Sequence, residues 1–149
     1  MPELFDILLV EDSDTDAEVT SRALTACAPS MRLNRVSDGS EAMQYLLLHG
    51  ENDSVVRRAP DLVLLDLNLP NIDGREVLRR IRASDSTRTI PVVVLTTSAS
   101  EVDVRACYQL YANAYVVKPI DYGEFVSAME SLTRFWMQIA KLPSRRTIA

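Results

Sequence analysis

Residues 61–70 read DLVLLDLNLP, and this stretch decides the fold of the chain. Its apolar run, residues 62–65, is short, rich in leucine and valine and followed by Pro70, which is typical of a strand buried on both faces. Asp66 lies where the run ends. Ligands of open α/β sheets bind outside the carboxyl ends of the strands, so Asp66 is either a reactive group or a turn residue. The choice depends on which other polar side chains reach the same edge.

Apolar runs of similar length alternate with helical patterns along the whole chain. The expected strands are residues 6–10, 31–36, 62–65, 91–95 and 114–117. The expected helices run from 14 to about 26, from about 41 to 50, from 73 onward, from 100 onward, and from 122 to about 142. A strand followed by a helix, five times over, predicts an α/β fold with a parallel sheet and helices on both faces.

A chain of 149 residues has the size of one domain, and we expect a single domain over 1–149. Its core is expected at about 5–142, with a loop insertion at 50–60 and a loose tail at 143–149. The net charge of −5 argues against a nucleic-acid partner. No apolar run approaches the roughly 20 residues that cross a bilayer, and the start of the chain lacks a basic signal segment. We therefore expect a cytoplasmic protein without a membrane partner.

The remaining side chains of unusual chemistry have ordinary structural interpretations. Cys27 and Cys107 lie far apart and are expected to be small buried residues, and a single His49 excludes a histidine-based metal site. The helix from residue 73 is expected to expose four arginines to solvent: Arg75, Arg79, Arg80 and Arg82. The helix from residue 100 is expected to begin at a Ser100 cap and to bury Val102, Ala106 and Leu110.

Polar residues follow four of the five expected strands. They are Glu11 and Asp12, Asp66, Thr96 and Lys118. Because parallel strands place their carboxyl ends along one edge of a sheet, these side chains are expected to meet. Three carboxylates in one crevice repel each other, and a hard cation such as Mg²⁺, held by one or two carboxylates and several waters, offsets that repulsion.

A carboxylate, a divalent cation, a lysine and a hydroxyl are the groups that phosphoryl transfer needs. Asp66 would supply the attacking oxygen, while the cation and Lys118 neutralise charge on the transferred oxygens. Each residue alone is weak evidence, since an Asp-Ser-Asp after a strand is usually a helix cap and a Lys-Pro is usually a loop. Helix capping does not explain the whole set.

The chain resembles the response-regulator receiver domains of two-component signalling over about residues 5–142. The resemblance rests on the acid pair at 11–12, on LLDLNLP at 64–70 followed by Asp-Gly at 73–74, on Thr96 and on Lys-Pro at 118–119. The spacings also fit, with 30 residues from position 66 to position 96 and 52 from position 66 to position 118. The resemblance implies a flavodoxin-like, doubly wound sheet of five parallel strands in the order 2-1-3-4-5, with an extended C-terminal helix.

The same resemblance assigns roles at the first and third strand ends. Asp66 would accept a phosphoryl group from a sensor histidine kinase with the help of Mg²⁺. Asp12 would ligate the ion directly, Glu11 would assist, and Asn68 would offer its backbone carbonyl. Glu11 is a departure, because many receivers have aspartate there; its longer arm still reaches an ion through water.

Roles also follow for the last two strands. Thr96 and Lys118 would each bind a phosphoryl oxygen. Tyr115 would be the switch aromatic, which turns inward when the threonine moves toward the phosphate. Without the resemblance, Tyr115 is interpreted as a surface aromatic of an edge strand.

A narrower resemblance links the chain to the small single-domain regulators that pair with bacterial phytochromes. It rests on the long segment before the third strand, residues 68–70, residues 95–98, Ala-Asn at 112–113, and Phe-Trp at 135–136 with Leu-Pro at 142–143. It implies that the partner is a bacteriophytochrome kinase.

The last expected helix carries an apolar stripe that is longer than the sheet needs. The stripe consists of Phe125, Met129, Leu132, Trp136 and Ile139. The first three are expected to pack on the sheet. Beyond them Trp136, Ile139 and Leu142 would be exposed on a monomer, and exposed apolar patches mark interfaces. We therefore expect a homodimer.

Two alternatives remain beside a single-domain receiver that is not an enzyme and has no effector domain in this chain. One is a Mg²⁺-dependent phosphohydrolase with an aspartate nucleophile. Such enzymes carry a second aspartate two residues on, where this chain has Asn68, which cannot transfer a proton. The other is a receiver-like scaffold that is not phosphorylated.

Overall fold

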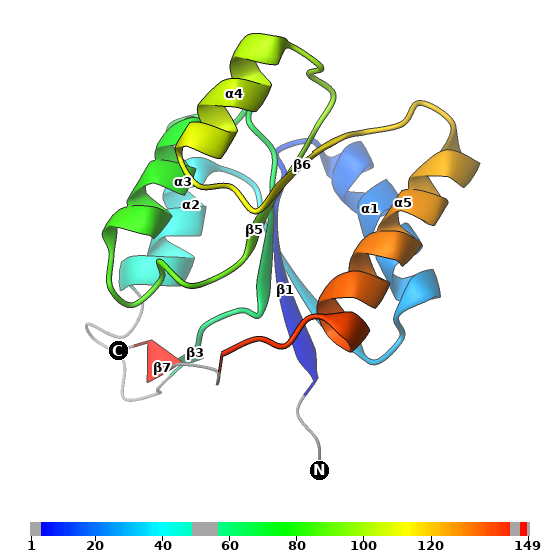
Figure 1. Ribbon diagram of the computed structural model, residues 1–149, viewed down its shortest axis with the longest axis horizontal. Helices are drawn as coiled ribbons and strands as arrows, with labels where there is room; N and C mark the ends of the chain where they lie inside the picture. Colours follow the sequence, from blue (N-terminus) through cyan, green and yellow to red (C-terminus); the bar gives the residue numbers. More distant parts are fainter. Residues whose placement is uncertain (1–3, 49–56, 144–146, 149) are drawn as a thin grey trace.

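The computed structural model describes residues 4–48, 57–143 and 147–148. Its centre is a five-stranded sheet in the order β2-β1-β4-β5-β6, in which every neighbouring pair is parallel (Figure 1). The strands are β1 (Phe5–Val10), β2 (Met31–Val36), β4 (Leu62–Leu65), β5 (Val92–Thr96) and β6 (Ala114–Val117). Counted among these five strands alone, the order is 2-1-3-4-5, which confirms the expected topology.

The helices cover both faces of this sheet (Figure 1). One face carries α1 (Asp14–Cys27) and α5 (Tyr122–Arg134). The other carries α2 (Gly39–Met43), which continues into the π-helical turn η1 (Gln44–Leu48), together with α3 (Gly74–Ala83) and α4 (Glu101–Gln109). This doubly wound arrangement brings the carboxyl ends of all five strands to one edge.

Strand β4 supplies side chains to two separate cores. Val63 and Leu65 belong to the core under α2, α3 and α4, whereas Leu62 and Leu64 belong to the core under α1 and α5. All four are fully buried, as the apolar run predicts for a central strand. Burial of each such side chain stabilises the fold by about 1.5–3 kcal/mol.

Short polar side chains begin four of the helices. The side chains of Ser13, Asp38, Asp73 and Asp121 accept backbone N–H groups at the starts of α1, α2, α3 and α5. Ser100 occupies the N-cap position before α4, as expected, but its side chain makes no capping hydrogen bond. The buried residue of α4 is Cys107, as expected of that cysteine, while Val102 is exposed rather than buried.

The C-terminal helix is shorter than the sequence predicts. After α5 it continues as the π-helical turn η2 (Phe135–Ile139) and ends there, because Ala140 is extended. The Ala140 N–H donates to the Phe135 carbonyl at 2.7 Å, the five-residue reach of a π turn. This wider turn changes which side chains face the core: Trp136 is half-buried against it, whereas Phe135 is 46% exposed. The expected exposure of Trp136 was therefore wrong.

A second, two-stranded sheet joins parts of the chain that are far apart in sequence. The strand β3 (Arg57–Arg58) pairs antiparallel with β7 (Thr147–Ile148). Residues 147–148 are thus a strand and not a loose tail. Two-residue strands are too short to give a periodic sequence signal, and residues 50–56 of the expected loop insertion at 50–60 lie outside the described residues.

Two of the four arginines on α3 do not form a solvated face. The Arg82 guanidinium donates to the carbonyls of Arg88 and Ile90 and to the Asn113 side chain, at 2.8–3.0 Å. It therefore fastens the end of α3 to the segments that lead into β5 and β6. Arg75 is also engaged, with acidic groups close to the strand ends.

Candidate functional site

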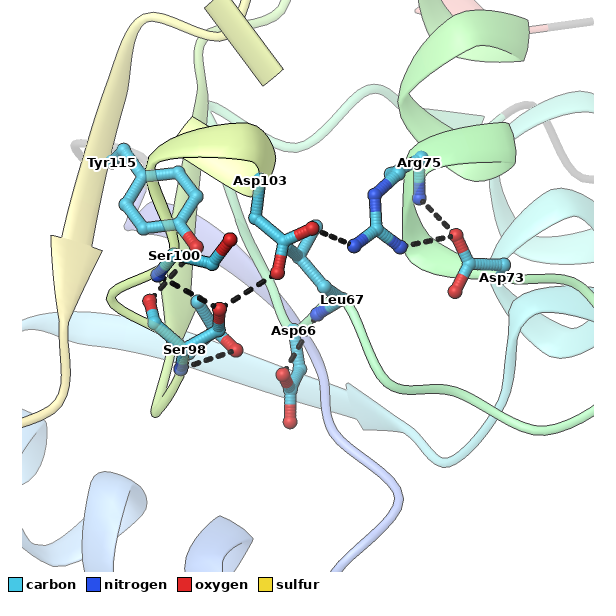
Figure 2. Close-up of polar contacts among 9 residues, drawn as sticks. Asp66, Leu67, Asp73, Arg75, Ser98, Ser100, Asp103 and Tyr115 are labelled. Atoms are coloured by element: carbon cyan, nitrogen blue, oxygen red, sulfur yellow. Dashed lines mark hydrogen bonds and ion pairs between the residues drawn. The ribbon is translucent and has the colours of Figure 1, made fainter. Parts of the chain in front are cut away.

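Asp66 lies at the carboxyl end of β4, as the sequence predicts. Its N–H donates to the Val10 carbonyl at 3.0 Å, which ties the end of β4 to the end of β1. Its side chain turns back to the following residue, where Oδ1 accepts the Leu67 N–H at 2.7 Å (Figure 2). With 9% of its surface exposed, Asp66 is a carboxylate with little water around it.

A close helix approach fixes the loop that carries Asp66. The Gly74 N–H donates to the Leu67 carbonyl at 2.9 Å. A Cβ atom at position 74 would lie 2.6 Å from Leu67 Cα and would overlap the Asp66 carbonyl oxygen. Only glycine allows the first turn of α3 to approach the strand end this closely. The Asp-Gly pair at 73–74 is thus part of the site's frame as well as a helix start.

Three carboxylates meet at this edge of the sheet. Glu11, Asp12 and Asp66 each offer an oxygen that lies within 4.8 Å of the other two. Glu11 is almost completely buried at 2% exposure, whereas Asp12 is exposed at the mouth of the cluster. Asn68 lies in the exposed loop two residues after Asp66, and the role of its carbonyl stays a prediction.

Lys118 supplies the positive charge of the cluster. Its Nζ lies 2.5 Å from Glu11 Oε1 and 3.7 Å from Asp66 Oδ2. Its backbone N–H donates to the Thr96 carbonyl at 2.7 Å, so the ends of β5 and β6 are held together. Asp16 on α1 is a further acid at 3.6 Å from Nζ, which the sequence did not reveal because an acid in a first helical turn is explained by the helix dipole.

The charges in this cluster do not balance. Burial raises the pKa of Glu11 to about 7, and the charge of Asp66 adds to that rise, while the Lys118 hydrogen bond opposes it. Burial alone would lower the pKa of Lys118, but its contacts with Glu11 and Asp66 outweigh this and raise the pKa. One lysine is therefore too little positive charge for the buried acids, and the cluster suits an additional cation.

Thr96 and Tyr115 are connected through the loop that follows β5. Thr96 is fully buried, and its Oγ1 lies 3.5 Å from the Ser98 N–H. The Tyr115 hydroxyl donates to the Ser98 carbonyl at 2.8 Å (Figure 2). The Tyr115 ring is half-buried and packs against the core under α3 and α4, so it points inward.

A polar path, formed by side chains that the sequence did not single out as functional, lies beside the site (Figure 2). Asp103 on α4 accepts the Ser98 hydroxyl at 2.7 Å and forms an ion pair with Arg75 on α3. Arg75 also reaches Asp73 at 3.0 Å. No local signal could have found these contacts, because the partners Arg75 and Asp103 are 28 positions apart and each looks like an ordinary surface charge of a helix.

The expected interface residues lie at the other end of the molecule, where α5 and η2 end. Ile139 is 65% exposed, Leu142 is half-buried beyond the helix, and Trp136 packs inward. Over the part of the chain that the structure describes, no helix is both long and apolar enough to cross a membrane.

Comparisons with known proteins agree with this geometry. Residues 7–130 match the response regulator receiver domain family. The probable methanogenesis regulatory protein FilR2 of Methanothrix harundinacea is 41% identical over 89% of this chain and 84% of its own. Response regulator Rcp1 of Synechocystis sp. is 41% identical over 93% and 92%.

Solved structures show the same likeness. The phosphorylated cyanobacterial phytochrome response regulator RcpA is 40% identical, with a TM-score of 0.86 over 95% of this chain and 99% of that chain. The Mn²⁺-bound form of Rcp1 is 40% identical, with a TM-score of 0.84 over 96% and 100%.

Proposed function

Because this chain belongs to the response regulator receiver domain family, we propose that Asp66 accepts a phosphoryl group from a sensor histidine kinase and thereby changes the protein's contacts. The observation that carries the proposal is the place of Asp66. Its carboxylate lies nine-tenths buried at a strand end, with two further acids within 4.8 Å and Lys118 Nζ at 3.7 Å. Asp66 is thus a potential nucleophile beside one cationic group, Lys118, and beside acids that can hold a metal cation; both positive charges would offset the charge of a transferred phosphoryl group.

The donor set at the site fits Mg²⁺. It consists of oxygen atoms only, and hard divalent ions prefer oxygen. Asp12 and Asp66 would hold the ion with the Asn68 carbonyl, and Glu11 would assist. When bound, the ion neutralises charge on the phosphoryl oxygens.

The protein's own groups have distinct tasks in the transfer. An Asp66 oxygen attacks the phosphorus, an O–P bond forms, and the P–N bond to the kinase histidine breaks. The imidazole nitrogen leaves with the electron pair and takes a proton from solvent. Lys118 binds a phosphoryl oxygen with its ammonium group, and the Thr96 hydroxyl binds another.

Phosphorylation by a small donor tests this role directly. With Mg²⁺ and acetyl phosphate, the intact protein should gain one phosphoryl group that is released by base, seen by mass spectrometry. EDTA and Asp66→Asn should each abolish the gain. Asp85→Asn is the matched control, because Asp85 lies beyond the far end of α3 and its side chain is 93% exposed. Phosphorylation that persists in Asp66→Asn would contradict the assignment of Asp66 as the phosphoacceptor.

We propose that this protein is cytoplasmic and that its kinase partner is a bacteriophytochrome. The support comes from the relatives, since RcpA is a phytochrome response regulator by name and covers nearly the whole chain. The test is a transfer profile in which phosphorylated histidine kinases of several classes compete for this protein. Faster transfer from kinases that are not phytochromes would contradict the pairing.

A homodimer through the end of the C-terminal helix is also proposed. Phe135 and Ile139 place exposed apolar surface at the end of η2. Sedimentation at tens of micromolar should show a dimer that Ile139→Ser weakens. Val102→Ser is the control, because Val102 is equally apolar and exposed but lies on α4. A wild-type monomer at these concentrations excludes the dimer.

We further infer that the protein turns over no separate substrate. Asn68 stands where an aspartate phosphohydrolase needs its proton donor. Hydrolysis of a generic phosphomonoester should stay at background with Mg²⁺ present. Repeated turnover that depends on Asp66 would instead indicate a phosphohydrolase.

A further inference from the structure

The two loops that border the site are joined to each other by side chains outside it (Figure 2). The loop after β4 ends at Asp73, whose carboxylate accepts both the Arg75 N–H at 3.1 Å and the Arg75 guanidinium at 3.0 Å. The other arm of the same guanidinium binds Asp103 on α4. Asp103 in turn accepts the Ser98 hydroxyl, in the loop after β5. The path therefore connects the loop of the phosphoacceptor with the loop of Thr96.

Ser98 is the residue on which these contacts converge. Its hydroxyl donates to Asp103 at 2.7 Å and accepts the Ser100 N–H at 3.3 Å. Its carbonyl accepts the Tyr115 hydroxyl at 2.8 Å, and its N–H lies 3.5 Å from Thr96 Oγ1. The position of Ser98 thus determines where the Tyr115 hydroxyl finds its acceptor and what the Thr96 hydroxyl has beside it.

The Arg75–Asp103 pair is well placed to fix Ser98. Hydrogen bonds from Ser98 and Arg75 lower the pKa of Asp103, so its charge is satisfied by these two partners. Arg75 itself is anchored, because Asp73 binds it at the start of α3, next to the tight Gly74 contact with the Asp66 loop. Arg79 and Arg80, on the next turn of α3, instead form ion pairs with Glu76 on their own helix.

We propose that Asp103 and Arg75 are positioning residues of the phosphorylation switch: they hold Ser98 so that its carbonyl accepts the Tyr115 hydroxyl and keeps the ring inward. The proposal rests on the proposed function, in which the inward ring accompanies Thr96 moving toward the phosphate. A contact that favours the inward arrangement then favours the phosphorylated form by at most the same free energy.

Removal of the Asp103 carboxylate should disfavour the phosphorylated form without changing the metal-binding acids. At a limiting concentration of acetyl phosphate, Asp103→Ala should lower the phosphorylated fraction on the order of threefold to tenfold, the usual size for one residue of a coupled network. Affinity for Mg²⁺ should be unchanged, because Asp103 is not among the clustered acids. Asp103→Asn keeps an acceptor for Ser98 and should retain part of the effect.

Arginine variants on the same helix supply a matched comparison. Arg75→Met should act in the same direction as Asp103→Ala, but less, because the bond between Ser98 and Asp103 remains. Arg79→Met removes an ion pair to Glu76 that has no link to Ser98, and phosphorylation should be unchanged. Equal losses in the two arginine variants would overturn the proposal.

A double-mutant cycle isolates the path through the tyrosine. Tyr115→Phe keeps the ring but removes the hydroxyl that Ser98 accepts. If Asp103 acts through that bond, Asp103→Ala should have no further effect on phosphorylation in the Tyr115→Phe background. Additive losses would contradict the proposal.

A measurement on the ring separates this proposal from the proposed function. In protein labelled with 3-fluorotyrosine, the ¹⁹F resonance of Tyr115 is identified by its loss in Tyr115→Phe. In Asp103→Ala, without any phosphodonor, it should move toward the position of a solvent-exposed tyrosine. A wild type that takes up no phosphate refutes the proposed function, while an unmoved resonance refutes the positioning role.

Circular dichroism of each variant tests whether it folds. If Asp103→Ala does not fold, the same measurements on Asp103→Asn and Arg75→Met test the positioning role instead.

Discussion

Two charged clusters of this molecule are built from similar contacts, but they shift the pKa of their glutamates in opposite directions. The buried cluster at the site consists of Glu11, Lys118 and Asp66; the surface cluster on α3 consists of Glu76, Arg79 and Arg80. In each, a glutamate oxygen lies 2.5 Å from a cationic nitrogen. Yet burial raises the pKa of Glu11 to about 7, whereas the hydrogen bonds from Arg79 and Arg80 lower the pKa of Glu76 to about 2.

The difference shows that the number of ion pairs does not identify a functional cluster. Glu76 keeps its water and gains two cations, so its charge is satisfied. Glu11 loses its water and shares one cation with Asp66, so its negative charge is costly until a further cation arrives. A costly charge at a strand end is a better sign of function than a well-paired one on a helix surface.

The largest effect is expected when the buried cluster loses its cation. Lys118→Met should lower the rate of phosphorylation by acetyl phosphate by about 10²–10³-fold, the usual cost of one lost electrostatic partner in a transition state. Affinity for Mg²⁺ should rise instead, because a competing positive charge is gone. Rates from mass spectrometry and affinities from titration calorimetry measure the two effects, and a parallel fall in both would contradict the division of tasks.

A second change removes a carboxylate at the mouth of the buried cluster. Asp12→Asn should weaken Mg²⁺ binding by at least about 10–100-fold, the range seen even for groups that only support a ligand. Calorimetric titration with MgCl₂ measures it. Glu76→Gln is the control, and its affinity should equal that of the wild type because Glu76 pairs with two arginines and does not belong to the clustered acids.

The raised pKa of Glu11 predicts how metal binding depends on pH. The folded state binds the Glu11 proton more tightly than the unfolded state does, so without metal this group costs stability as pH rises from about 4.5 to about 7. Mg²⁺ requires the deprotonated carboxylate and offsets that loss, and its affinity should fall by up to about tenfold for each pH unit below 7.

Thermal melts with and without Mg²⁺ between pH 5 and pH 8 test this dependence. The stabilisation by Mg²⁺ should grow across the range. The raised pKa of Lys118 keeps that group charged throughout, so it does not contribute to the change. A stabilisation that is independent of pH would show that Glu11 takes no part in metal binding.

The smallest effect is expected in the surface cluster. Glu76→Gln should leave phosphorylation unchanged and lower the melting temperature only slightly near pH 7, because exposed ion pairs contribute little. The lowered pKa of Glu76 means that its contribution is present above about pH 4.5 and lost as pH falls toward 2. The difference from the wild type should therefore narrow in melts at acidic pH, and a difference that widens would reverse the assigned direction.

The parts of the molecule that the sequence revealed are those that follow from local patterns and topology. The approach of Lys118 to Asp66 could be predicted because each follows an apolar run, and parallel strands align such positions. The assignment of Tyr115 as the switch aromatic came only from the resemblance, and its inward position needed the structure.

The remaining features depend on packing between distant segments. The Arg75–Asp103 pair, the Asp16 contact with Lys118 and the β3–β7 sheet have no periodicity or motif. The π turn that places Phe135 outward is one extra residue in a helical repeat, which apolar spacing does not resolve. In each case the local sequence does not determine the contact or the turn, and the packing of distant segments decides it.

The close packing at Gly74 makes it possible to disturb the shape of the site without changing its charged groups. A single methyl group there would press on the backbone of Asp66 and Leu67 while every carboxylate, the lysine and the hydroxyl of the site stayed in the sequence. We therefore expect Gly74→Ala to inactivate the protein while every ionisable group of the site is retained. This variant is therefore a control that shows how much activity is lost when the site is disturbed and its charges are retained.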